Sequence, residues 1–121
     1  MNKILLTGAS GFIGSHFMQN CPLPIVSVKR SAGKNSTSDI FYIDSLNKET
    51  SWSGAFREIS TVVHLAAVAH SKHCSIPSVY DVNVEGTVNL AKSAANAGVK
   101  RFIFLSSIGV LGGYTEKGSK F

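Results

Sequence analysis

Short apolar runs alternate with longer stretches of mixed apolar and polar residues along this chain. Five of the runs are almost continuously apolar, and they lie at residues 4–6, 25–28, 40–43, 61–65 and 101–105. Runs of this kind are typical of strands that are buried on both faces of a parallel sheet. The pattern therefore predicts five buried strands.

Apolar residues recur at helical spacing between the predicted strands. The clearest helix is expected over 79–97, where Val84, Val88, Ala91 and Ala95 fall on one face that should pack on the sheet. Gly98 is a suitable residue to end it, because glycine accepts the left-handed conformation that often follows a helix.

A shorter helix is also expected over 11–19, with Phe12, Ile13 and Phe17 as its apolar positions. Residues 44–60 should hold at most a short helix around 52–56, where aromatic side chains should cover the third and fourth strands. Strands that alternate with helices predict an α/β fold, a Rossmann-like doubly wound parallel sheet with strand order 3-2-1-4-5.

Composition and charge narrow the class of protein. Of the 121 residues 44% are hydrophobic and 16% are charged, which excludes a disordered chain. The net charge is +5, and four basic residues precede the first acidic residue, Asp39. A positive N-terminal third favours either nucleic acid or a small ligand that carries phosphate. No apolar run approaches the roughly 20 residues of a membrane span, no leader pattern is present, and only two cysteines occur, so we expect a cytoplasmic protein.

The most specific motif is the glycine-rich segment TGASGFIG at 7–14, which follows the first strand and opens the first helix. Gly8 would permit the tight turn, Gly11 would let backbone N–H groups approach a pyrophosphate, and Gly14 would let the helix pack on the strand. The helix N-terminus would add partial positive charge. A glycine-rich turn without a ligand is the alternative, but the surrounding strands and helices favour a dinucleotide site.

The residues at the end of the second strand bear on the choice of dinucleotide. An acid at this place would bind the adenosine ribose hydroxyls of NAD, whereas Lys29 and Arg30 stand here and would suit the 2′-phosphate of NADP. The alternative is a solvated basic pair. Asp44, after the third strand, could accept a hydrogen bond from the adenine amino group, or it could simply cap a turn.

Three sequence blocks and the spacing between them resemble the extended short-chain dehydrogenase/reductases, and more narrowly the NAD-dependent nucleotide-sugar epimerases and dehydratases. The blocks are TGASGFIG at 7–14, VVHLAA at 62–67 and NVEGTVNLAKSAANAGVKRFIFLSS at 83–107. The resemblance covers nearly the whole chain. It implies transfer of hydride between a sugar carbon and a nicotinamide, as in a UDP-sugar 4-epimerase, with NAD as the cofactor and a nucleotide sugar as the substrate.

The resemblance also implies roles for matching residues. Ser107 would be the catalytic hydroxyl that bonds the sugar hydroxyl being oxidised. With the residues discussed above, the expected cofactor contacts are Gly8, Ser10, Gly11, Phe12, Ile13, Gly14, Lys29, Arg30, Asp44, Leu65, Ala66, Ala67, Asn83 and Ser106. No metal site is expected, because the cluster His70, His73 and Cys74 has no second group of ligands to complete it, although His70 could line the cofactor site.

The chain departs from the family pattern at its end. The Tyr-x-x-x-Lys pair that supplies the base in this family is absent, since Gly118 stands four residues after Tyr114. We therefore expect residues 1–121 to be the N-terminal NAD(P)-binding part of a longer enzyme, inactive by itself and without the substrate domain. Missing later elements should leave apolar residues uncovered, such as Phe102 and Phe104, and so we also expect self-association or a homodimer.

Two other function classes compete with the enzyme. A regulatory module that binds NAD(P) without catalysis would also lack the Tyr-x-x-x-Lys pair. A nucleic-acid binder would explain the charge of +5, but no nucleic-acid motif supports it and the basic residues gather where a cofactor phosphate would lie.

Overall fold

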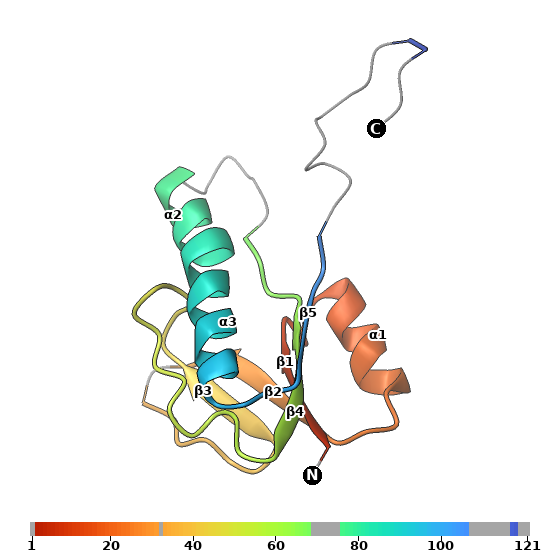
Figure 1. Ribbon diagram of the computed structural model, residues 1–121, viewed down its shortest axis with the longest axis vertical. Coiled ribbons are helices and arrows are strands. Elements are labelled where there is room, and N and C mark those ends of the chain that lie inside the picture. Colours follow the sequence, from red (N-terminus) through yellow and green to blue (C-terminus); the bar gives the residue numbers. More distant parts are fainter. Residues whose placement is uncertain (1, 32, 69–75, 107–116, 119–121) are drawn as a thin grey trace.

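The computed structural model describes residues 2–31, 33–68, 76–106 and 117–118 (Figure 1). The five strands are β1 (Lys3–Thr7), β2 (Ile25–Arg30), β3 (Ile40–Ile43), β4 (Ile59–His64) and β5 (Arg101–Phe104). The helices are α1 (Phe12–Asn20), α2 (Ile76–Tyr80), a π-helical segment η1 (Asp81–Gly86) and α3 (Thr87–Asn96). All five predicted strands are present, with ends shifted by two residues at most.

The strands form one parallel sheet in the order β3-β2-β1-β4-β5, which confirms the predicted order. The direction of strand order reverses between β1 and β4, since the chain builds outward to β3 on one side and to β5 on the other. In such sheets ligands bind outside the carboxyl ends of the strands at this reversal. The fold thus places the ends of β1 and β4 at the expected ligand site.

Two helical layers cover the two faces of the sheet (Figure 1). On one face, Leu90 and Ala94 of α3 pack against Leu5 and Val62 in the larger apolar core. On the other face, a smaller core has Ile4, Leu6 and Val63 at its centre, with Phe17 among the side chains packed against it. Alternate residues of β1 thus face opposite layers, which explains why the strand is continuously apolar.

The expected helix over 79–97 is present but divided, and its predicted buried face is wrong. The π-helical segment η1 lies between α2 and α3, and within α3 itself the face that packs on the sheet differs from the predicted one. The residues that face the sheet are Gly86, Leu90 and Ala94, whereas Val84 and Val88 are 41% and 45% exposed. Gly86 and Ala94, one helical turn before and after Leu90, are small and let the helix lie close to the strands.

Two further expectations concern the segment around 52–56 and the first turn of α1. Residues 53–58 form turns, within the expectation of at most a short helix. Trp52 nevertheless covers the sheet as expected, since it is buried and stacks on Phe41 of β3 with ring centroids 5.9 Å apart. In α1 the side chains of Phe12 and Ile13 are 81% and 51% exposed. Both residues stand in the first turn of the helix, which begins beyond the carboxyl end of β1.

Candidate cofactor site

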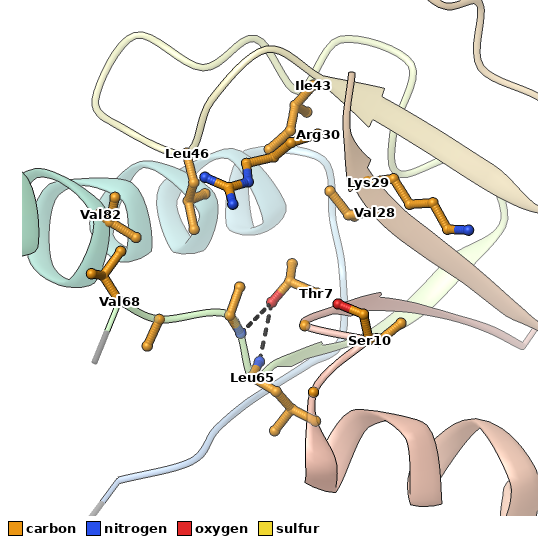
Figure 2. Close-up of a pocket in the computed structure, with 15 residues that line it drawn as sticks. Thr7, Ser10, Val28, Lys29, Arg30, Ile43, Leu46, Leu65, Val68 and Val82 are labelled. Atoms are coloured by element: carbon orange, nitrogen blue, oxygen red, sulfur yellow. Dashed lines mark hydrogen bonds between the residues drawn. The ribbon is translucent and has the colours of Figure 1, made fainter. Parts of the chain in front are cut away.

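A cavity of about 560 Å³ opens at the carboxyl ends of β1, β2 and β4 (Figure 2). This volume lies within the usual range for sites that bind small molecules and cofactors. Its described lining residues are Thr7, Gly8, Ala9, Ser10, Gly11, Val28, Lys29, Arg30, Ile43, Leu46, Leu65, Ala66, Ala67, Val68 and Val82. Eight of the predicted contact residues are therefore brought together, and the cavity lies at the reversal of strand order.

The glycine-rich loop forms the end of the cavity that faces α1, and two of its glycines are required by close packing. Gly8 has a φ of +77°, and a Cβ there would lie 2.8 Å from the Ala66 backbone nitrogen. A Cβ on Gly14 would overlap the Gly8 carbonyl oxygen. Gly11 differs, because its Cβ would meet only the Gly8 oxygen at 3.5 Å, so the chain could hold a side chain there.

The N-terminus of α1 is directed at this cavity without a side chain to cap it. Gly11 is the N-cap residue, no side chain makes a capping hydrogen bond to the N–H groups of the first turn, and that turn holds no acidic residue. The first N–H groups of a helix have no partner within the helix and carry partial positive charge. Together with the glycine loop, this end of the cavity fits a pyrophosphate.

The opposite end of the cavity is basic. Lys29 and Arg30 are exposed and are its only ionisable side chains among the described lining residues. Figure 2 shows Arg30 reaching toward Leu46, whereas Lys29 extends the other way. The one ion pair within the described residues joins Lys3 and Glu58, so neither cation has a carboxylate partner there.

The segment after β4 forms one wall, and Asn83 of η1 holds its far end. The Asn83 amide nitrogen donates to the Val68 carbonyl at 2.9 Å, and its side-chain oxygen accepts from the Val68 N–H at 2.7 Å. Asn83 itself is not among the lining residues. The structure therefore gives Asn83 a role in positioning the wall, where the sequence predicted a direct contact.

A second wall residue, Leu46, is set by α3. Gly86 lets the helix approach closely, since a Cβ there would lie 2.9 Å from Leu46 Cγ. Asn89 then donates to the carbonyls of Asn47 at 3.1 Å and Thr50 at 2.9 Å. These bonds fix the turn after β3. Sequence reasoning missed Leu46, since its position depends on a contact between segments 40 residues apart.

Several other predicted residues lie outside the cavity lining. Asp44 is exposed and lines a neighbouring cavity of about 350 Å³ that shares Ile43 with the first. The side chains of Phe12 and Ile13 point to solvent, which leaves only their backbone N–H groups for a ligand. Ser106 is exposed just beyond β5. The predicted catalytic Ser107, like His70 and Tyr114, lies outside the described residues.

The buried His64 and its neighbour Thr7 are the polar residues beneath the cavity. His64 is 1% exposed, and its ring nitrogens lie 2.6 Å from the Thr7 hydroxyl oxygen and 2.8 Å from the Thr87 hydroxyl oxygen. Burial lowers the pKa of His64 from 6.5 to about 4. The expectation of a packed core histidine is thus confirmed, whereas the role of Thr7 was not foreseen.

The lowered pKa of His64 predicts that the folded state begins to lose stability at a pH above the range in which carboxylates titrate. The folded state holds His64 neutral down to about pH 4, while the unfolded chain protonates it near 6.5, so stability is full above 6.5 and falls as the pH drops toward 4. We expect a loss of roughly 2 kcal/mol between pH 7 and pH 5. Urea unfolding at both pH values measures it, and His64→Asn should flatten the slope. An equal slope in both proteins would contradict it.

No three His, Cys, Asp or Glu side chains converge as metal ligands within the described part of the chain. The cluster at 70–74 lies outside that part. The helices that are described also lack the length and apolar character needed to cross a membrane.

Comparison with known proteins places these features in a family. A model of the NAD dependent epimerase/dehydratase family matches residues 4–121. UDP-glucose 4-epimerase of Vibrio cholerae is 38% identical over 127 residues, which cover 98% of this chain and 39% of that protein. UDP-glucose 4-epimerase of Klebsiella pneumoniae is 33% identical over 133 residues, which cover 91% of this chain and 92% of that protein.

The fold is also similar to that of a solved structure. MoeE5 in complex with UDP-glucose and NAD superposes with a TM-score of 0.72 at 32% identity, over 93% of this chain and 38% of that one. The chain thus spans about two fifths of the length of MoeE5 and of the V. cholerae relative.

Proposed function

Because the chain belongs to the NAD dependent epimerase/dehydratase family, we propose that it is the cofactor-binding part of an enzyme that acts on a nucleotide sugar. The observation that carries the proposal is the cavity at the ends of β1, β2 and β4. It combines the glycine loop, the uncapped N-terminus of α1 and two cations that have no carboxylate partner among the described residues. Such a cavity fits the pyrophosphate and adenosine of a dinucleotide.

The residues of this chain would bind and orient the cofactor. The backbone N–H groups of Phe12 and Ile13 would hold the pyrophosphate, because the Gly11 N–H already donates to the Gly8 carbonyl oxygen at 3.2 Å. Leu46 and Val28 would cover the adenine. The segment 65–68 would lie along the other half of the dinucleotide. When bound, the nicotinamide supplies the hydride acceptor for the sugar carbon, which is the chemistry shared by epimerases and dehydratases of this family.

At the adenosine end we propose that Lys29 and Arg30 also admit a 2′-phosphate. The relatives and the family description point to NAD, but within the described lining no carboxylate is available to bind the ribose hydroxyls. Asp44 remains a proposed adenine contact, because it stands in the adjoining cavity. Ser107 remains the proposed contact to the sugar, and Ser106, which directly precedes it after β5, remains a proposed cofactor contact.

Calorimetry with NAD⁺ and with UDP-glucose tests the proposal. The chain should bind NAD⁺, and 4-epimerisation of a UDP-sugar should require the longer protein, since the Tyr-x-x-x-Lys pair is not in this sequence. A chain that binds neither NAD⁺ nor NADP⁺ would overturn the cofactor assignment. Binding of the dinucleotide by a longer protein that turns over no sugar nucleotide would instead favour the regulatory module.

We further propose a cytoplasmic protein that pairs with a second copy of itself. Apolar side chains remain exposed in several places, among them Val84 and Val88 on the outer face of the helix and Ile103 and Phe104 on the edge strand. Apolar patches of this kind become interfaces or aggregate. Light scattering across a concentration series should show a dimer or larger species, and a monomer at every concentration would refute the pairing.

A further inference from the structure

Thr7, the last residue of β1, holds three polar partners with one hydroxyl. The N–H groups of Leu65 and Ala66 donate to its Oγ1 at 3.1 Å and 3.0 Å (Figure 2). His64 Nδ1 lies 2.6 Å from the same oxygen. A hydroxyl has two acceptor positions and one proton. Both N–H groups donate to the hydroxyl oxygen, the Leu65 N–H being shared with the Thr7 carbonyl oxygen at 3.2 Å, and this arrangement directs the hydroxyl proton to His64 Nδ1.

The hydrogen bonds of Thr7 determine the tautomer and the protonation state of the His64 imidazole. Because Nδ1 accepts from Thr7, the proton of the neutral ring sits on Nε2, which donates to the Thr87 hydroxyl at 2.8 Å. A protonated ring would place a second donor against the Thr7 hydroxyl, which has no acceptor position left. One tautomer and one protonation state therefore satisfy all the groups, and they link the end of β1 to the first residue of α3.

The hydroxyl of Thr7 sets the separation between the two sides of the cofactor cavity. On one side stands Gly8, whose Cβ position is already within 2.8 Å of the Leu65 and Ala66 backbone. On the other side stands the segment 65–66, tied to Thr7 by its two N–H groups. These residues meet between β1 and β4, where the strand order reverses. Without the hydroxyl, the Ala66 N–H would lose its partner, and the Leu65 N–H would keep only the Thr7 carbonyl oxygen at 3.2 Å.

We propose that Thr7, His64 and Thr87 form a positioning relay that fixes the wall at 65–66 and thereby sets the affinity for the half of the dinucleotide that lies over β4. The inference rests on the proposed function. The adenosine half belongs over β1 and β2, next to the glycine loop and Lys29. Loss of the relay should therefore weaken binding of the whole dinucleotide and spare a ligand that contains only the adenosine diphosphate half.

Thr7→Val tests the relay, because valine has the shape of threonine without the hydroxyl, and Thr7→Ser is the matched control that keeps it. Calorimetry on the full chain compares NAD⁺ with ADP. For Thr7→Val we expect NAD⁺ affinity to fall roughly tenfold, as for loss of a buried hydrogen-bond partner, with ADP affinity within about twofold. Thr7→Ser should leave both ligands within about twofold. Equal weakening of NAD⁺ and ADP, or no weakening, would overturn the relay.

Two measurements keep the test decisive if Thr7→Val does not fold. Thr87→Val removes only the acceptor of His64 Nε2 and lies outside the cavity lining, and it should also weaken NAD⁺ more than ADP. ¹⁵N NMR of the wild-type imidazole should show a proton on Nε2 and none on Nδ1, and the opposite tautomer would refute the relay. If the wild-type chain binds neither ligand, the proposed function fails, while the NMR result still decides the tautomer.

Discussion

Gly14→Ala is expected to lower the melting temperature by on the order of 10 °C and to abolish dinucleotide binding. The added Cβ would overlap the Gly8 carbonyl oxygen and lie 2.9 Å from the Ala9 Cα. Both neighbours are backbone atoms of the glycine loop, so no side chain can move aside to relieve the clash. Displacing α1 from the loop should cost about 3 kcal/mol. Thermal unfolding and calorimetry with NAD⁺ measure the two effects.

Gly11→Ala is the matched control, since it makes the same chemical change three residues earlier. Its Cβ would meet only the Gly8 oxygen at 3.5 Å, and the backbone φ of −76° suits alanine. The melting temperature should therefore stay within a few degrees of the wild type. Because Gly11 lines the cavity, its Cβ should still weaken NAD⁺ binding where the pyrophosphate lies. Unchanged affinity in Gly11→Ala would place the pyrophosphate elsewhere.

The arrangement of strands could be predicted from sequence because each strand is recognised by its own residues. The run Ile4 to Leu6 is apolar whichever neighbours it meets, and the glycine motif that follows it requires a strand before it and a helix after it. These local signals also located the eight predicted residues that line the cavity. Predictions of this kind succeed because each one depends on residues that lie close together in the sequence.

The parts that could not be predicted depend on contacts between distant segments. The face of the late helix that packs on the sheet holds Gly86, Leu90 and Ala94, and its close approach is set by the contact of Gly86 with Leu46, 40 residues earlier. The bond pair between Asn83 and Val68 is a supporting contact that the sequence did not indicate, and the cofactor contact of Asn83 stays a prediction. Thr7 was overlooked because a threonine at a strand end is common, and its three partners lie 57 to 59 residues away.

The double substitution Lys29→Asp with Arg30→Asn is expected to reverse the cofactor preference of the chain. The wild type should bind NADP⁺ tighter than NAD⁺, because the 2′-phosphate meets two cations that have no carboxylate partner among the described residues. In the variant, the carboxylate introduced at position 29 can accept hydrogen bonds from both ribose hydroxyls and repels a phosphate. We expect the ratio of the two dissociation constants to change by roughly 100-fold, about 2.7 kcal/mol.

A control of equal charge separates a local contact from the field of the whole protein. Lys34→Asp with Lys48→Asn changes the net charge by the same three units, and both residues are exposed and lie outside the lining of the cofactor cavity. If the cations act by contact, this control should keep the wild-type preference for NADP⁺. The NADP⁺ advantage of the wild type should also shrink as salt is raised. Equal affinities for NAD⁺ and NADP⁺ before and after the double substitution would remove Lys29 and Arg30 from the site, while leaving the dinucleotide cavity itself in place.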